Sequence, residues 1–269
     1  MKRFLGAFIF IFCGALGFRA DALPNAAEII PAKGGAIRIT PIFHGSLQIE
    51  YKGKVIQVDP FSGGDYSGAK KADLILITHT HPDHFDAKEI VALRKPYAAI
   101  VLPEKMYSSG SYLKATRTKL GFQGLTINPM KNGDDNWPFG IRVEAVPMYN
   151  LARGPKPGAK FHPKGEGNGY VLTLGGKRIY IAGDTEATPE MKALKNIVIA
   201  FLPMNLPYTM TPQEAAVGAR AFKPKVVYPY HYRYPFTKVN DNPQQFAKAL
   251  AGSGIEVRLR DWYHNAAAR

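Results

Sequence analysis

Short apolar stretches, separated by turns that contain glycine or proline, recur along most of this chain and predict a mixture of strands and helices. Where apolar and polar residues alternate, or a brief apolar run stands alone, a half-buried or fully buried strand is expected. The expected strands span residues 37–43, 47–51, 55–58, 72–77, 98–102, 125–128, 141–146, 170–174, 178–181, 196–201, 226–228 and 255–259. The expected helices span residues 87–94, 104–119, 212–222 and 243–250.

Two of these helices begin with a capping box. Asp86 is followed three residues later by Glu89, and Thr211 is followed by Glu214 with a proline at the first helical position. Both patterns satisfy the free N–H groups of a helix start. The chain has 269 residues and shows two strand-rich halves, each followed by helices, without a tandem repeat or a linker. One α/β domain is therefore predicted.

Three histidines and an aspartate directly follow the apolar strand 72–77, in the run His79-Thr80-His81-Pro82-Asp83-His84. Proteins of the α/β class place their active sites at the carboxyl ends of strands. Imidazole and carboxylate groups are good ligands for zinc, iron and manganese. On an extended segment His79 and His81 point to one side and can bind one ion, while Asp83 and His84 can reach a second. The alternative is a polar turn with surface histidines, but the flanking strand and capped helix favour a metal site.

The N-terminal residues 1–22 have the features of a secretory signal peptide. A basic start is followed by an apolar stretch over residues 4–18 and by Ala20-Asp21-Ala22, which has the small-x-small form of a cleavage site. Cleavage after Ala22 would place residues 23–269 in the periplasm or outside the cell, without a stable membrane span; an uncleaved anchor is the alternative. Because Cys13 lies in the leader, the mature domain has no thiolate for catalysis or metal binding.

The chain is basic, with 35 Lys and Arg against 21 Asp and Glu. Removal of the leader leaves a net charge of about +12. This charge is compatible with an anionic small-molecule substrate or an anionic surface, although solvated lysines are the simpler explanation. The longest basic run is Lys70-Lys71 and no basic–aromatic stripe is present, so a dedicated nucleic-acid binder is not expected. The oligomeric state is not indicated.

The run from His79 to His84 resembles the signature of the metallo-β-lactamase-fold superfamily of metal-dependent hydrolases. The resemblance covers residues 36–262, and two weaker motifs follow in the expected order: Gly183-Asp184-Thr185 after an apolar strand, and Tyr230-His231 at the end of a later one. It implies a four-layer αββα sandwich in a single domain. The stretches Phe43-His44-Gly45-Ser46 and Val58-Asp59-Pro60 are similar to the branch with ascorbate-phosphate lactonases and N-acyl-phosphatidylethanolamine phospholipases.

The resemblance implies two divalent metal ions, with zinc expected first and manganese or iron as alternatives. One ion would be bound by His79, His81 and His162, and the other by Asp83, His84 and His231, with Asp184 bridging them. Many family members carry a strand-end histidine where this chain has Met148-Tyr149-Asn150, which leaves His162 as the candidate third ligand of the first ion. Tyr149 or water is the alternative there. Asp184 could instead be a turn residue, and His231 a core or surface histidine.

Further roles at the site are open at this stage. Asp83 is the candidate catalytic residue, because it could orient a hydroxide and pass its proton to the leaving group. His44 could support a ligand or contact substrate, or could be a histidine satisfied within a turn. Tyr149 and Tyr208 could donate to a substrate oxygen, although tyrosine is also common in cores and at pocket rims. His264 is expected to be exposed.

The function implied by the resemblance is that of a secreted binuclear hydrolase that uses metal-bound hydroxide on an ester, lactone, amide or phosphodiester bond. A β-lactamase is a narrower alternative. A di-iron redox enzyme of the same fold is another, but the chain lacks an appended domain and a cysteine in its mature part. A metal-binding protein without turnover is the third. Substrate choice depends on loops whose shape the sequence does not reveal.

Overall fold

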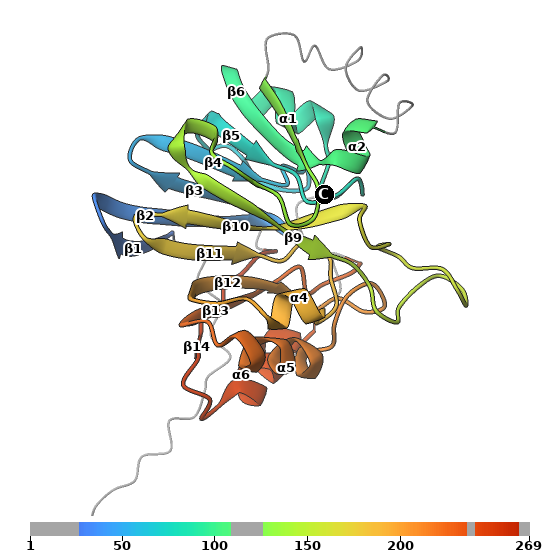
Figure 1. Ribbon diagram of the computed structural model, residues 1–269. Helices are drawn as coiled ribbons and strands as arrows, with labels where there is room; N and C mark the ends of the chain where they lie inside the picture. The colour runs from blue at the N-terminus through green and yellow to red at the C-terminus, as the bar shows by residue number, and fades with distance from the viewer. Residues whose placement is uncertain (1–26, 109–125, 236–239, 264–269) are drawn as a thin grey trace, which may run out of the picture.

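A computed structural model describes residues 27–108, 126–235 and 240–263 of the chain (Figure 1). Its strands form two sheets of seven. The first sheet has the order β1 (Glu28–Ala32), β2 (Gly35–Phe43), β3 (Ser46–Tyr51), β4 (Lys54–Val58), β5 (Ala72–Leu76), β6 (Arg94–Pro103) and β7 (Thr126–Met130). The second has the order β14 (Glu256–Val257), β13 (Val226–Tyr230), β12 (Ile197–Pro203), β11 (Lys177–Ile181), β10 (Gly167–Leu174), β9 (Arg142–Met148) and β8 (Asp135–Asn136).

Each sheet is antiparallel in its first strands and parallel in its last. Antiparallel pairing joins β1 to β4 and β8 to β11, whereas β4 to β7 and β11 to β14 pair in parallel. As a result β2, β4, β5, β9, β11 and β13 all run in the same sense within their sheets. Their carboxyl ends meet at one end of the sandwich, which is where an α/β fold gathers its functional side chains.

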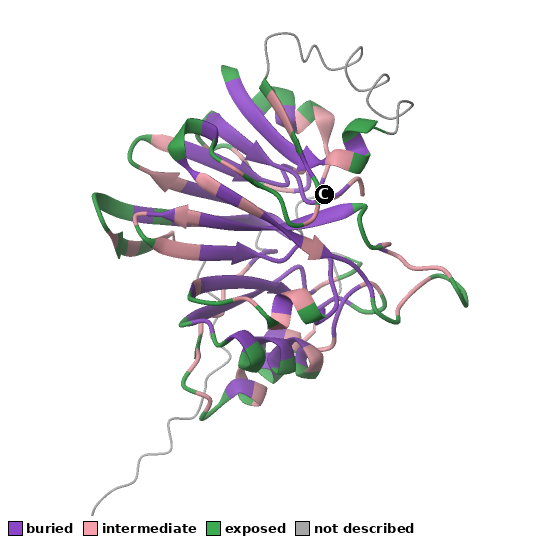
Figure 2. Cartoon of the chain, viewed as in Figure 1, coloured by how far each residue is buried: buried purple, intermediate pink, exposed green. Residues whose placement is uncertain are grey.

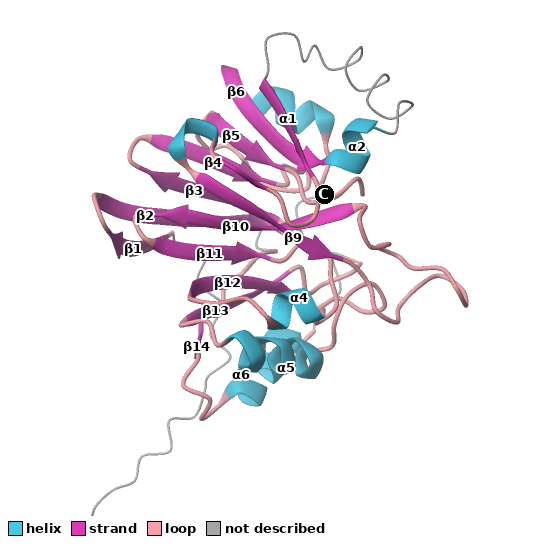
Figure 3. Ribbon diagram, in the orientation of Figure 1, coloured by secondary structure: helices cyan, strands magenta, loops and turns pink. Residues whose placement is uncertain are grey.

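The main core lies between the two sheets, and helices cover their outer faces (Figure 3). Helices α1 (Ala87–Leu93) and α2 (Glu104–Ser108) lie on the first sheet; α4 (Pro189–Lys192), α5 (Pro212–Phe222) and α6 (Asn242–Leu250) lie on the second. Alternate residues of β5 point to the two faces of the first sheet. Leu74 and Leu76 face the core between the sheets, while Ile75 packs towards Ile90 of α1. Burial on both faces explains the continuous apolar run (Figure 2). The αββα sandwich is confirmed.

Both predicted helix starts are capped by the expected side chain, and the second forms the complete capping box. The Asp86 carboxylate accepts hydrogen bonds from the N–H groups of Lys88 and Glu89 at 3.0 and 3.3 Å. Thr211 and Glu214 form a complete capping box, with Oγ1 accepting from one backbone N–H and the carboxylate accepting from the other. The first cap orients the helix that immediately follows the histidine-rich run, so it fixes the end of that loop.

Several elements differ from expectation. Strand β1 was not predicted, because it is an edge strand that contains Pro31 and exposes Ile29 to solvent. Strand β14 is shorter than the predicted 255–259, and the short elements β8, α4 and the 3₁₀ turn Pro138–Gly140 were also missed. The predicted helix 104–119 is described only as far as Ser108. The predicted leader, residues 1–22, and His264 lie outside the described residues.

No helix among the described residues has both the length and the apolar character needed to span a bilayer.

Candidate metal centre

The histidine-rich run forms a compact turn at the carboxyl end of β5. The N–H groups of His84 and Phe85 both donate to the carbonyl of His81 at 2.9 Å, which folds the turn back on itself. The strand before it is held in the sheet, since Ile77 N–H donates to the carbonyl of Val101. The ligand side chains are therefore presented by backbone that is fixed on both sides.

The first group of metal-binding side chains consists of His79, His81, His162 and Asp184, whose donor atoms lie within 4.8 Å of one another. His162 Nε2 is 3.3 Å from His81 Nδ1 and 3.5 Å from Asp184 Oδ2. His79 Nε2 is 4.0 Å from the same oxygen, and it is buried without a hydrogen-bond partner among the described residues. A buried imidazole nitrogen left in this way fits a metal ligand, because an unpaired buried acceptor is otherwise costly.

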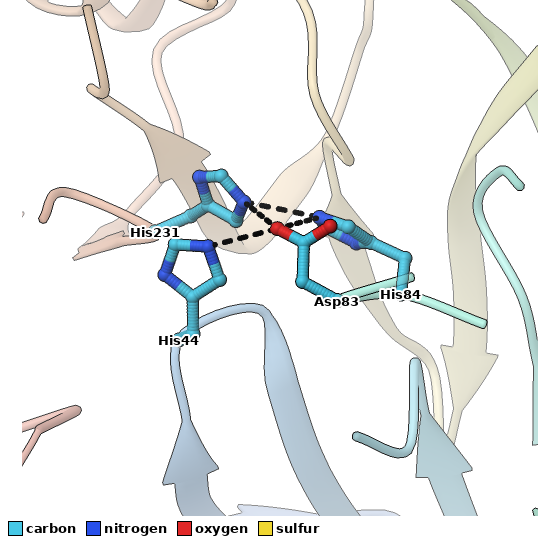
Figure 4. A group of neighbouring side chains, drawn as sticks. All are labelled: His44, Asp83, His84 and His231. Atoms are coloured by element: carbon cyan, nitrogen blue, oxygen red, sulfur yellow. Dashed lines mark hydrogen bonds and ion pairs between the residues drawn. The ribbon is translucent and has the colours of Figure 1, made fainter. Parts of the chain in front are cut away.

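The second group consists of His44, Asp83, His84 and His231 (Figure 4). The Nε2 atoms of His84 and His231 are 3.0 Å apart, and they lie 3.7 and 3.6 Å from Asp83 Oδ2. His44 Nε2 is 3.2 Å from the same carboxylate oxygen. Two imidazoles and a carboxylate that converge on one point provide the nitrogen and oxygen donors that zinc, manganese and iron accept.

Asp184 connects the two groups through its two carboxylate oxygens. Oδ1 lies 3.3 Å from His231 Nε2 and 3.5 Å from His84 Nε2, whereas Oδ2 faces His162 and His79 of the first group. The side chain is almost fully buried, at 4% exposed. The structure thus places Asp184 between the groups, in the position that the sequence predicts for a bridging ligand.

A buried carboxylate, Asp59, supports the histidines from behind. Its Oδ2 is 2.8 Å from His84 Nδ1 and accepts a hydrogen bond from Thr78 Oγ1 at 2.6 Å, while Oδ1 accepts from the Thr78 N–H at 2.7 Å. Thr78 Oγ1 is also 3.0 Å from His79 Nδ1. These contacts place a proton on Nδ1 of both histidines, so Nε2 is the nitrogen that each ring turns towards a metal. In the sequence, Asp59 is visible only as part of a branch motif, without an indicated role of its own.

A second supporting residue, Asn150, was also missed. Its Oδ1 accepts hydrogen bonds from the backbone N–H and from Nδ1 of His162, at 2.8 and 2.9 Å. Its Nδ2 donates to the carbonyl of Tyr208 and to Glu186 Oε1, at 2.8 and 3.2 Å. Asn150 is the second residue after β9, where the resemblance expected a histidine ligand nearby. In this chain the strand end holds the ligand of a following loop, so His162 completes the first group.

The remaining candidates are placed as follows. His44 is buried and joins the second group; its Nδ1 is 2.6 Å from the Tyr263 hydroxyl. Tyr149 is not brought to either group, because its hydroxyl donates to Glu190 Oε2 at 2.9 Å; His162, to which it was the alternative, is the residue found in the first group. Tyr208 is half-buried, with its ring 4.9 Å from the ring of Phe161.

Burial and the mixture of charges shift the pKa values of the site. Burial lowers the pKa of His79, His81 and His162, the last to about 4, so these imidazoles are neutral at pH 7. Burial alone would also lower the pKa of His84, but the carboxylates of Asp184, Asp83 and Asp59 outweigh it and raise that pKa to about 10.

For the carboxylates of Asp83 and Asp184, burial and the neighbouring charges shift the pKa in the opposite directions. Burial alone would raise the pKa of Asp83 and of Asp184, yet the surrounding imidazoles hold both below the usual value. For Asp83 the largest contribution of this kind comes from His84. Both carboxylates are therefore ionised at neutral pH, as a metal ligand must be.

Comparisons with known proteins agree with this geometry. Residues 38–231 match the model of the β-lactamase superfamily domain. A UPF0173 metal-dependent hydrolase from Anoxybacillus flavithermus is 32% identical over 83% of this chain and 97% of that protein. A candidate metal-dependent hydrolase from Parabacteroides distasonis, solved as a crystal structure, is 44% identical over 88% of this chain and 98% of the other, with a TM-score of 0.74.

A metallo-hydrolase from the archaeon Ignicoccus hospitalis is similar over 85% of this chain and 96% of the other, at 25% identity and a TM-score of 0.66. The residues matched by the family model, 38–231, include every member of both metal-binding groups. The more specific branch suggested by the sequence stays a prediction. The chain belongs to the UPF0173 metal-dependent hydrolase family of the metallo-β-lactamase superfamily.

Proposed function

We propose that this metal-dependent hydrolase is binuclear and cleaves an ester, lactone, amide or phosphodiester bond. The observation that carries the proposal is the pair of groups joined by Asp184, which provides donors for two ions side by side. Two divalent ions, when bound, lower the pKa of water towards neutrality and stabilise the charge that develops on the attacked and leaving oxygens. We expect zinc, with manganese or iron as alternatives that the donor set also accepts.

Asp83 is the residue we propose for proton transfer. Its side chain is 25% exposed, whereas those of His84 and Asp184 are at most 4% exposed, so Asp83 is the carboxylate of the site that meets solvent. Its lowered pKa keeps it ionised at neutral pH, so it can accept a hydrogen bond from a water molecule and orient it. His44, within hydrogen-bonding distance of the same carboxylate, orients it.

The surroundings support a small-molecule substrate with an apolar portion. A small cavity beside the first group is lined by Thr80, Phe161, Pro163 and Glu166 together with the histidines. Phe161 packs edge-on against Tyr208, whose ring lies 5.4 Å from that of Tyr234. This aromatic row suits an acyl or aromatic group next to the bond that is cleaved. The positive net charge favours anionic compounds among such substrates.

Export remains part of the proposal. The leader-like residues 1–22 suggest a periplasmic or secreted protein, which N-terminal sequencing of the purified chain would test by showing whether it starts at Leu23.

The decisive experiment combines metal content with turnover. Elemental mass spectrometry of the purified protein should find about two equivalents of zinc or manganese, and fewer in His81→Ala. Ester, lactone and phosphodiester panels should then show turnover that the same substitution abolishes. Tyr149→Phe serves as a matched control, because its hydroxyl faces Glu190 and both measurements should be unchanged. Two irons with visible absorbance would instead favour redox chemistry. Metal without turnover on any panel would favour a binding protein.

A further inference from the structure

The end of the sandwich opposite the metal centre carries a concentration of lysines. Strands β5, β12 and β13 run towards the metal centre, so the residues just before them lie at the far end, together with the hairpin turns β1–β2, β3–β4 and β10–β11 (left in Figure 1). These positions, here called the basic end, hold Lys33, Lys52, Lys54, Lys71, Lys95, Lys177, Lys195, Lys223 and Lys225.

Most of this positive charge is not neutralised. Lys33, Lys52, Lys195, Lys223 and Lys225 are exposed, and in the described part of the chain no carboxylate lies within 4.0 Å of their ammonium groups. The acidic residues near this end already form ion pairs with other basic residues. The buried Asp73 is held by Lys54 and Lys95 at 3.1 and 2.6 Å, and Glu144 contacts both Arg142 and Arg178. The excess charge therefore projects into solvent.

Three large aromatic side chains are exposed at the same end. Tyr97, in β6 next to Lys95, is 69% exposed, and Trp137 and Phe139 are 55% and 43% exposed. Trp137 immediately precedes the 3₁₀ turn between β8 and β9, and Phe139 lies within it with a left-handed φ of 53°. Lys54 Nζ lies 4.8 Å from the centre of the Phe139 ring, which joins this aromatic turn to the lysines of the first sheet.

We propose that the basic end docks on the surface of an anionic phospholipid bilayer. Exposed tryptophan and tyrosine side chains favour the headgroup region, and basic residues beside them are attracted to its negative charge. Nucleic acid is the less suitable occupant, because a single strand is usually bound in a basic groove that follows its backbone. Here the lysines are spread over the ends of two sheets. Docking in this way turns the metal centre towards water, where it stays open to substrate.

Vesicle binding tests the proposal directly. The purified protein is mixed with phosphatidylcholine vesicles that do or do not contain phosphatidylglycerol, and the bound fraction is measured by sedimentation at low and high salt. We expect binding only to the anionic vesicles, and weaker binding at high salt. Reversal of Lys33, Lys52, Lys195 and Lys223 to glutamate should weaken it by at least about tenfold. All variants carry the same residues 1–26, so any contribution of these residues to vesicle binding is equal in each variant and does not affect the comparison between them.

A second set of four reversals is the matched control. Lys88, Lys105, Lys131 and Lys156 are also exposed, but they lie in elements that follow the carboxyl ends of strands, at or near the metal-centre end. Their reversal changes the net charge by the same amount and should leave vesicle binding within about twofold of the unchanged protein. Equal losses in both sets would overturn the proposal, because the effect would then follow net charge alone.

Tryptophan fluorescence provides an independent readout. The chain has two tryptophans, and Trp262 is fully buried while Trp137 is exposed. Insertion of the aromatic turn should shift the emission to the blue on anionic vesicles, and Trp137→Phe should remove the shift. Binding without a blue shift would overturn the aromatic part of the proposal. Binding to single-stranded DNA but not to vesicles would overturn it as a whole. Hydrolysis of a soluble substrate should be unchanged in the basic-end variants.

Discussion

Substitution of Asn150 by alanine tests how the first metal-binding group is held together. The amide accepts two hydrogen bonds from His162 and donates one each to Tyr208 and Glu186. Both Asn150 and His162 are 3% exposed, so water cannot replace these partners freely. Loss of several buried hydrogen bonds should lower the free energy of unfolding of the metal-free protein by about 2–4 kcal/mol.

The same substitution should weaken metal binding. Without the acceptor on its Nδ1, the His162 ring is free to rotate, and Nε2 no longer points at Asp184. Residues that orient a metal ligand typically contribute about 10- to 100-fold to affinity. Competition with a chromophoric chelator would measure this loss, and thermal unfolding with and without metal would measure stability. Two ions are expected, and because Asp184 joins their groups, weaker binding at the first group should also lower the apparent affinity of the second.

Two matched variants distinguish a loss of His162 orientation from a general loss of stability. Asn150→Asp keeps the acceptor for His162 but places a second carboxylate beside Glu186, so it should lower stability and preserve most of the metal affinity. Tyr149→Phe removes the neighbouring hydroxyl, which faces Glu190, and should change neither quantity. Metal affinity that is unchanged in Asn150→Ala would refute the assignment of His162 as a ligand held by Asn150.

Three further predictions concern the whole centre. Asp59→Asn removes the charge behind His84 and should weaken metal binding by about 10- to 100-fold, measured by the same chelator competition; an unchanged affinity would show that Asp59 serves the fold alone. In the metal-free protein the raised pKa of His84, about 10, keeps this ring protonated at pH 8, while His162 is neutral. NMR of histidine-labelled protein should therefore detect a charged His84 ring at pH 8, and this charge should be lost when zinc is added. A neutral His84 would contradict the conclusion that the surrounding carboxylates outweigh burial. Metal at a thousand times its dissociation constant should stabilise the fold by about 4 kcal/mol, so chelation should lower the melting temperature by roughly 8–16 °C, and no shift in calorimetry would count against bound metal.

The sequence predicted the fold well, because strands and helices depend on short-range pattern, and the structure brings the residues proposed as local ligands together. His79, His81, Asp83 and His84 follow one buried strand, and their spacing alone suggests two ions. The predicted strands and capped helices match the structure for the same reason. Each strand or helix is indicated by the pattern of its own residues, and the two sheets pack together because each has an apolar face to bury.

What escaped prediction depends on contacts between distant segments. His162 comes from a loop, and its position relative to Asp184 is set by Asn150. An asparagine at this place in the sequence does not by itself indicate a residue that supports a metal ligand. Asp59 is 25 residues from His84 in the chain, and its role follows from the parallel pairing of β4 with β5. Tyr149 was open as a ligand because a tyrosine at a strand end can face either side of the sheet, and its partner Glu190 is 41 residues away.

The division of Asp184 between the two groups has a consequence for how the enzyme acquires its ions. Each carboxylate oxygen faces one group, so an ion that binds on either side fixes the orientation that the other side requires. Occupancy of the two positions should therefore be cooperative. At half the saturating amount of metal, the population would divide mainly into empty and fully loaded molecules, with few singly loaded ones. Under metal limitation, total activity would then fall through the number of competent molecules, while each of those keeps its full turnover rate.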